Sequence, residues 1–127
     1  MKIRVLPLTV LALTCLTALT TLAAGFELAG DAERAREDYR KYCATCHGAE
    51  GRGDGVMAKV LDPKPKDFTN AAYMKTRTDE QLYTAVKEGG GAVGLSTKMA
   101  AWKHVLDDQQ IRDLTALVRE LGSEGGG

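Results

Sequence analysis

Apolar residues recur at three- and four-residue steps in three stretches of the 127-residue chain, which is the spacing of helices with one buried face. The first stretch follows Gly30, with Asp31 as the expected N-cap. The second begins at Thr78, with Gln81 in capping-box register, and a run of glycines from Gly89 ends it. The stripes comprise Ala32, Ala35, Tyr39, Tyr42 and Cys46 in the first stretch and Leu82, Tyr83 and Val86 in the second.

The third stretch carries the most complete set of helix signals. Asp107 is the predicted N-cap with Gln110 at the third helical position, and Leu106 and Ile111 stand where a hydrophobic staple packs. We expect Gly122 to end this helix and the glycine-rich tail after it to be disordered. The inward stripe is Ile111, Leu114, Leu117, Val118 and Leu121.

Residues 48–77 carry little regular pattern. The glycines at their start each cost about 1 kcal/mol in a helix, and we expect one short helix over residues 56–61, with Met57 as core filler, before Pro63 breaks it. So long an irregular segment fits a small domain if it packs on a ligand. Because alternating β patterns are almost absent as well, the sequence predicts an all-α fold.

The first residues read as a targeting segment. A basic start precedes an apolar run over residues 5–22, and small residues follow. We therefore expect residues 1–25 to be a cleaved signal peptide and residues 26–127 to form one domain. An uncleaved membrane anchor is the alternative, because the run approaches spanning length. Lipid attachment at Cys15 is a further alternative that the residues before it disfavour.

The charge balance is even, with 17 basic and 17 acidic residues in the whole chain. Residues 26–127 would carry about −2, so no basic excess points to nucleic acid. Residues 59–104 differ, with eight basic and five acidic residues. These charges either form a mildly basic rim or are solvated loop charges that point in several directions.

The candidate chemistry is concentrated in Cys43-Ala44-Thr45-Cys46-His47. Two thiols and an imidazole at positions i, i+3 and i+4 of a helical turn lie on one face, so they reach a single flat ligand. This is the spacing of covalent haem attachment, with two thioethers and a proximal imidazole. A structural zinc would need four sulfur or nitrogen ligands, and the only candidate beyond this motif is the distant His104. A thioredoxin-like dithiol would open a helix in a βαβ unit, and a plain disulfide leaves His47 unexplained.

With Lys98-Met99-Ala100-Ala101-Trp102 and the closing amphipathic helix, this motif makes the chain resemble a small class I c-type cytochrome over residues 31–122. The resemblance implies three main helices, with short helices and loops wrapped around one covalently attached haem c. It also implies that Ala35 and Tyr39 mark the crossing of the first and last helices. A proline carbonyl, Pro63 rather than Pro65, would accept a hydrogen bond from the proximal histidine.

The sixth iron ligand is expected to be Met99, as the resemblance implies, although Ala100 follows it where many members have proline. A thioether opposite histidine raises the reduction potential relative to two imidazoles. Met74 and His104 are the weaker candidates. Trp102 is expected at the haem edge, where its indole N–H would reach a propionate, and Phe68 and Tyr73 are candidate ring contacts.

These observations predict a periplasmic monohaem electron carrier that transforms no substrate and is therefore not an enzyme. Its expected partners are redox proteins such as an oxidase, a dehydrogenase or a membrane electron-transfer complex, with no nucleic acid and no membrane span after signal cleavage. Two alternatives stay open. The chain is a haem subunit permanently docked in a larger dehydrogenase or oxidase complex, or a gas-binding or enzymatic haem protein with an open sixth position.

Overall fold

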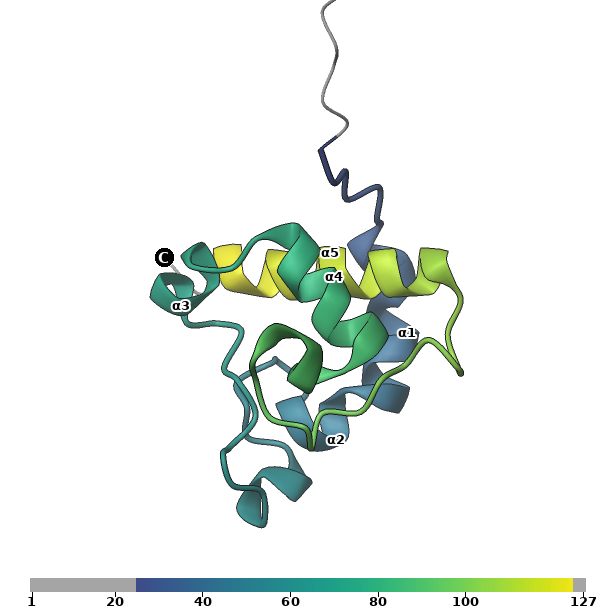
Figure 1. Ribbon diagram of the computed structural model, residues 1–127. Coiled ribbons are helices and arrows are strands. Elements are labelled where there is room, and N and C mark those ends of the chain that lie inside the picture. Colours follow the sequence, from purple (N-terminus) through teal and green to yellow (C-terminus); the bar gives the residue numbers. More distant parts are fainter. Residues whose placement is uncertain (1–24, 125–127) are drawn as a thin grey trace, which may run out of the picture.

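The computed structural model describes residues 25–124, and every regular element within them is helical (Figure 1), which confirms the predicted all-α class. Across these residues no helix is both long and apolar enough to span a membrane. The elements are α1 (Ala32–Tyr42), α2 (Ala44–His47), the 3-10 helix η1 (Val56–Lys59), α3 (Ala71–Lys75), α4 (Asp79–Glu88), the 3-10 helix η2 (Gly90–Val93) and α5 (Asp108–Glu124).

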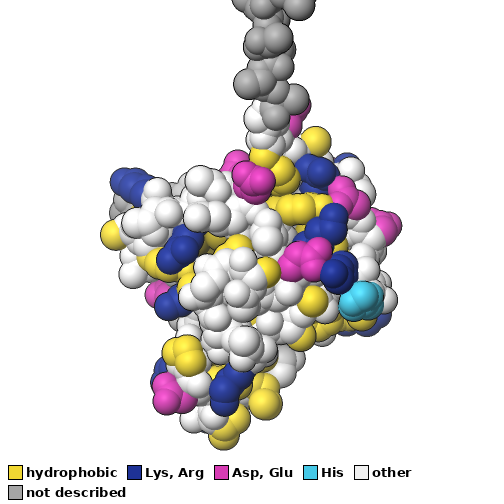
Figure 2. Space-filling view, viewed as in Figure 1, with side chains coloured by type: hydrophobic (Ala, Val, Ile, Leu, Met, Phe, Trp, Pro, Cys, Tyr) yellow, Lys and Arg dark blue, Asp and Glu magenta, His cyan; other side chains and the backbone are white. Residues whose placement is uncertain are grey.

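The segment around η1 projects from the body as a small lobe below α2 (Figure 1). Hydrophobic side chains gather at the tip of this lobe beside charged ones (Figure 2). The prediction that Met57 fills the core is wrong, because its side chain is 42% exposed, and its neighbour Ala58 is the buried residue of the turn. The helical pattern was real, but so short a turn buries only one small residue against its neighbours.

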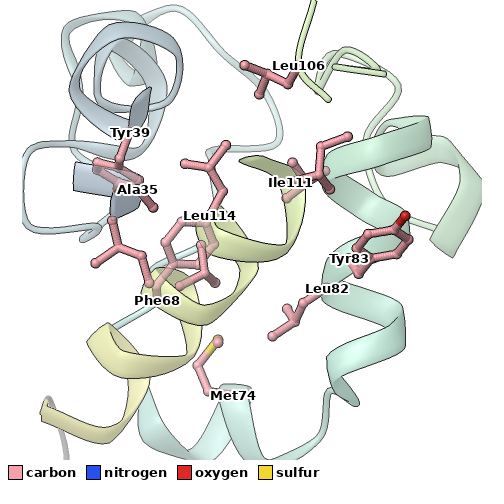
Figure 3. Packing of buried hydrophobic residues seen from close by; sticks show 12 residues of the cluster. Ala35, Tyr39, Phe68, Met74, Leu82, Tyr83, Leu106, Ile111 and Leu114 are labelled. Carbon is pink, nitrogen blue, oxygen red and sulfur yellow. The ribbon is translucent and has the colours of Figure 1, made fainter. Parts of the chain in front are cut away.

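The core lies where α1 and α4 pack against α5, and the labelled side chains converge there from all three helices (Figure 3). Ala35 and Tyr39 of α1 are 1% and 3% exposed, so α1 and α5 pack closely at the expected positions. Ile111 and Leu114 of α5 are 1% exposed each, and Leu106 is buried beside them as the predicted staple requires. The predicted stripes therefore do form the core or pack against it, except that Cys46 lines the cavity described below.

The predicted N-caps of the three main helices are all present. The Asp31 side chain accepts from two backbone N–H groups of α1, and Thr78 and Gln81 form a reciprocal capping box at α4. At α5 the Gln110 N–H donates to Asp107 Oδ1 at 2.8 Å, while the Asp107 N–H donates to Gln110 Oε1 at 3.0 Å. These bonds satisfy backbone donors that have no partner within the helix.

A buried carboxylate, Asp113 of α5, fastens the start of α1 to the last helix. It accepts from the Asp31 N–H at 2.7 Å, from the Arg34 guanidinium at 2.8 Å and from Gln109 Nε2 at 2.9 Å. Burial alone would raise the pKa of Asp113, but these hydrogen bonds favour its charged form and lower the pKa below its ordinary value.

Gly122 does not end the last helix, as the sequence predicted, because α5 continues through it to Glu124. Gly122 is buried, and a Cβ atom there would lie 2.8 Å from Met74 Cγ and 3.2 Å from the Phe68 carbonyl oxygen. The glycine is thus explained by the close approach of α3 and the loop before it. The predicted signal peptide with Cys15 and the last tail residues lie outside the described residues, apart from Gly25.

Candidate functional site

A cavity of about 550 Å³ opens between the motif at residues 43–47 and the segment around Met99. Its size is within the range of about 300–1,000 Å³ that is usual for small-molecule and cofactor sites. Most of its walls are apolar. The lining residues are Tyr42, Cys43, Cys46, His47, Leu61, Pro63, Lys64, Pro65, Lys66, Gly94, Leu95, Ser96, Lys98, Met99, Ala100 and Trp102.

The first wall of the cavity is the junction between α1 and α2. The His47 and Cys46 N–H groups donate to the Cys43 carbonyl at 2.9 and 3.1 Å, so one helical turn brings both thiols and the imidazole to the cavity. Both cysteines are free thiols. Burial, together with the nearby Asp38 and Cys46, raises the pKa of the Cys43 thiol to about 12. At neutral pH the Cys43 thiol is therefore protonated.

The imidazole of His47 is held from behind by two contacts. Its Nδ1 lies 3.2 Å from the Lys66 carbonyl oxygen, and because a carbonyl only accepts, Nδ1 is the donor and carries the proton. Its ring stacks on Phe68 at a centroid distance of 4.4 Å and an interplanar angle of 17°. Burial lowers the pKa of His47, and the bond to the carbonyl opposes this shift.

The predicted acceptor for His47 was the Pro63 carbonyl, and this prediction is wrong in the structure. Gly53 explains why: its N–H donates to the His47 carbonyl at 2.8 Å, and a Cβ atom there would lie 2.5 Å from the Pro65 carbonyl oxygen. The chain therefore passes closest to His47 just after Pro65, and the Lys66 carbonyl reaches the imidazole. Pro63 instead lines the cavity.

The turn after His47 is fixed from the core. Tyr39 is 3% exposed, and its hydroxyl donates to the Gly48 carbonyl at 2.9 Å. Burial raises the pKa of this phenol, so it remains a donor. Gly48 adopts a φ of 82°, and a Cβ atom there would lie against the Asp54 carboxylate. The aromatic side chain of α1 thus connects the helical core to the turn that follows the motif.

Phe68 is 8% exposed and does not line the cavity. Its contact is with His47, so it supports the imidazole from the side away from the cavity. Tyr73 also lies outside the lining residues, with Lys66 and Arg77 placed over its ring at 5.5 and 5.0 Å. The sequence identified Phe68 as a ring near the site, but not what it touches.

The second wall is the segment with Met99. The Gly90 N–H donates to the Met99 carbonyl at 3.1 Å, and the Met99 N–H donates to the Ser96 carbonyl at 3.2 Å. A Cβ atom on Gly90 would lie 2.4 Å from the Ser96 carbonyl oxygen, and one on Gly89 2.9 Å from that of Met99. The glycine run after α4 therefore allows close packing of the backbone that presents Met99.

The other candidates for an iron ligand lie elsewhere. Met74 is 2% exposed inside the core, Met57 is exposed on η1, and His104 is exposed before α5. Among the methionines and the second histidine of the described residues, Met99 alone lines the cavity that His47 also lines.

Trp102 forms part of the cavity wall, and its ring lies 5.3 Å from that of Tyr42 at an angle of 54°. The backbone N–H of Trp102 donates to the Val86 carbonyl at 3.1 Å, and that of Lys103 donates to the Lys87 carbonyl at 3.2 Å. The end of α4 thus fixes this aromatic pair beside the motif.

Charge around the cavity is of one sign, because three lysines and no acidic residue line it. These lysines are Lys64, Lys66 and Lys98. Two other lysines of residues 59–104 have acidic partners instead: Lys103 Nζ lies 2.5 Å from Glu88 and Lys87 Nζ 3.1 Å from Asp108. The basic segment therefore contributes in part to the rim and in part to surface ion pairs.

The residues present fit a haem c. Two thiols and an imidazole on one wall are the groups that bind such a haem and its iron, and a thioether on the other wall is the usual second ligand in cytochromes c. Apolar and aromatic side chains fill the wall between them. The structure thus brings together at one cavity the two thiols, the imidazole and the thioether that the sequence analysis named.

Comparisons with known proteins agree with this chemistry. Residues 30–118 match the profile of the family described as cytochrome C oxidase, cbb3-type, subunit III. No curated protein matches the chain. A solved structure of the Kuenenia stuttgartiensis reducing HAO-like protein complex Kustc0457/Kustc0458 contains a similar chain, with 27% sequence identity and a TM-score of 0.54.

The similarity covers 78% of this chain and 44% of the Kuenenia chain, so this chain spans less than half the length of that relative. The family match, in contrast, extends over most of the chain and includes the motif, α4 and most of α5. The chain is therefore a small c-type cytochrome of the electron-transfer kind, and it belongs to the family described as cytochrome C oxidase, cbb3-type, subunit III.

Proposed function

We propose that this chain is a monohaem electron carrier, with one haem c joined covalently to Cys43 and Cys46 and with His47 and Met99 as axial ligands of its iron. The observation that carries the proposal is that the two thiols, the imidazole and the thioether all line one cavity. When bound, the haem supplies an iron that takes up and releases one electron.

The protein's own residues hold and orient the site. The Lys66 carbonyl fixes the proton of His47 on Nδ1, so Nε2 would be free to bind the iron, and stacking on Phe68 limits rotation of the imidazole. The Met99 thioether favours the reduced iron more than a second imidazole would, so it raises the potential. Trp102 and Tyr42 form an apolar part of the cavity wall, where the Trp102 indole N–H would be available to a propionate.

The carrier role needs no substrate site, so we propose that the protein is not an enzyme. We also propose that it works in the periplasm after removal of residues 1–25, because an exported chain suits covalent haem attachment. Its partners would be redox proteins such as an oxidase, a dehydrogenase or a membrane electron-transfer complex.

A gas-binding or enzymatic haem protein needs an open sixth position, and Met99 at the cavity wall disfavours that alternative.

A second candidate function is a haem subunit that stays docked in a larger redox complex. The family description, which names a subunit of an oxidase, and the Kuenenia relative, which belongs to a complex, favour it. The two candidates differ in the size of the native protein. Gel filtration of protein from its natural source at the size of a monomer supports a free carrier, and elution with other redox subunits supports the docked subunit.

Covalent haem attachment tests the proposal directly. Protein matured in a host that attaches haem should keep its haem through acid-acetone extraction and denaturing electrophoresis, and the pyridine haemochrome spectrum should give one haem per chain. The Cys43→Ala, Cys46→Ala double variant should lose the stained band, since no thioether remains. A wild-type band without haem would contradict the proposal. Met57→Ala, an exposed substitution away from the cavity, should keep the band.

A further inference from the structure

We propose that the exposed apolar tip of η1, formed by Val56, Met57 and Val60, is the docking surface for an acidic redox protein whose contact surface has an apolar centre. Val56 and Val60 are each 72% exposed and Met57 is 42% exposed. With Val105, they are the exposed large hydrophobic side chains of the described residues, and these three lie within five consecutive positions. This proposal rests on the electron-carrier function proposed above and adds the kind of partner.

The tip is built onto the motif that binds the haem. A Cβ atom on Gly55 would lie 2.3 Å from the Thr45 carbonyl oxygen and 2.6 Å from that of Ala44, so the start of η1 lies directly on α2. Lys64 closes the lobe, because its Nζ donates to the Ala58 carbonyl at 2.6 Å. The tip therefore has a fixed position relative to Cys46 and His47 at the end of α2.

The tip also continues into the cavity wall. Leu61 and Pro63, which follow Val60 along the chain, both line the cavity. A protein that covers Val56, Met57 and Val60 therefore approaches the cavity, where an electron would enter or leave. Short-lived redox encounters use small interfaces of less than about 1,200 Å² in total, so a patch of three side chains is large enough for one.

Charges of both signs lie beside the tip itself, but the lysines that line the adjoining cavity favour an acidic partner. Lys64, Lys66 and Lys98 line the cavity without an acidic residue among the lining, and Lys59 is an exposed member of η1 itself. Carboxylates on a partner would complement these lysines and speed its approach, while an apolar centre would cover the tip. The structure thus fits a partner with apolar residues inside an acidic border.

Other occupants fit this surface less well. A second copy would bring like-charged lysines together, and three apolar side chains are few for the roughly 800 Å² per partner of a stable interface. The tip lacks the Trp and Tyr side chains that favour membrane interfaces, and this disfavours a membrane as its occupant. Charged side chains of both signs lie beside the hydrophobic tip in Figure 2.

The test compares electron transfer from a protein donor and from a small donor to the haem-loaded chain. The protein probe is reduced [2Fe–2S] ferredoxin, an acidic protein that gives up one electron as the ferric iron of this chain becomes ferrous. Ascorbate is the small reductant. The variants are Val56→Ser with Val60→Ser, and Val105→Ser as the matched control, since Val105 is 58% exposed but outside the tip.

We expect the second-order rate constant with ferredoxin to fall about tenfold in the Val56→Ser, Val60→Ser variant and to stay unchanged in Val105→Ser. The rate with ascorbate should stay the same in all three proteins. In the wild type, the ferredoxin rate should fall as salt rises, and Lys59→Gln with Lys98→Gln should weaken this salt dependence. The reduction potential and the thermal unfolding of each variant are measured alongside, and both should equal those of the wild type.

Equal ferredoxin rates in the wild type and the tip variant would overturn the docking proposal alone, provided that ascorbate reduces both proteins. A wild-type protein that neither donor reduces would contradict the electron-carrier function and, with it, the docking proposal. A dimer in sedimentation velocity that the tip variant abolishes would assign the surface to a second copy instead. Binding to vesicles of anionic lipid that the tip variant abolishes would assign it to a membrane, and either result overturns the proposal.

Discussion

The helical frame of α1, α4 and α5 and the walls of the cavity are held together in different ways. In the frame, buried side chains such as Leu114 and Ile111 interlock, and side-chain caps close the helix ends. In the walls, backbone lies directly on backbone: Gly53 packs on Pro65, Gly55 on α2, and Gly90 on Ser96. The frame therefore contains its own apolar core, whereas the walls enclose a cavity lined with apolar groups that only a ligand covers.

This difference separates stability from chemistry within one small domain. Substitutions in the frame should change the free energy of unfolding and leave the iron's surroundings alone. Substitutions in the walls should change the iron's surroundings with little effect on the frame. Tyr39 and Phe68 are where the two regions meet, since both are buried in the core and both contact residues of the site.

The largest expected effect on folding is in the frame. Leu114→Ala removes a side chain that is 1% exposed and leaves a cavity, so it should lower the free energy of unfolding by about 2–5 kcal/mol. Denaturant titration followed by circular dichroism measures the change. Val60→Ala, at a side chain that is 72% exposed, should change it by less than about 0.5 kcal/mol. Similar losses in the two variants would show that the core is not where we place it.

A smaller effect is expected at the buried carboxylate of the frame. Asp113→Asn should lower the free energy of unfolding by about 1–2 kcal/mol at pH 7, since the charged hydrogen bonds weaken while Arg34, more than half exposed, stays solvated. The folded state lowers the pKa of Asp113, so this stability is complete above its unfolded pKa of about 3.9 and is lost as the pH falls through the folded value.

Denaturant titrations between pH 7 and pH 2 test this dependence. The difference in free energy of unfolding between wild type and Asp113→Asn should shrink as the pH falls below about 4. Glu37→Gln, an exposed carboxylate on α1, is the matched control and should follow the wild type at every pH. A difference between wild type and Asp113→Asn that is constant with pH would mean that the charge of Asp113 does not stabilise the frame.

The smallest effect on the fold, with the clearest effect on the iron, is expected in the wall. In the haem-loaded protein, Met99→Ala should remove the weak sulfur-to-iron charge-transfer band of the ferric form and lower the reduction potential, because the thioether is lost. Far-ultraviolet circular dichroism should stay helical. Met57→Ala is the methionine control and should keep the band. Survival of the band in Met99→Ala would exclude this methionine as the ligand.

Local signals predicted most of the frame. Caps such as Asp107 with Gln110 and stripes of period 3.6 depend on residues a few positions apart, so the sequence contains them in full. The motif at residues 43–47 was equally local. The sequence also placed Met99 in the segment that forms the second wall of the cavity.

Contacts between distant segments could not be predicted in the same way. The acceptor for His47 depends on where a loop passes another loop, and a proline in the sequence gives no measure of that path. Gly122 resembles a helix stop because the pattern does not reveal that α3 lies against it. Met57 fits a helical stripe, yet η1 projects from the body and exposes it. Each error concerns a tertiary neighbour.

The bond from His47 to the Lys66 carbonyl has a consequence for how this site can vary. The acceptor belongs to the backbone, so any amino acid at position 66 presents the same oxygen. Substitution of the side chain at position 66 therefore leaves the hydrogen bond to His47, and with it the basicity of the imidazole, unchanged. A residue inserted or deleted between positions 53 and 66 would instead move the carbonyl away from Nδ1. The orientation of the His47 imidazole is therefore encoded in the length of this loop rather than in the identity of a partner side chain.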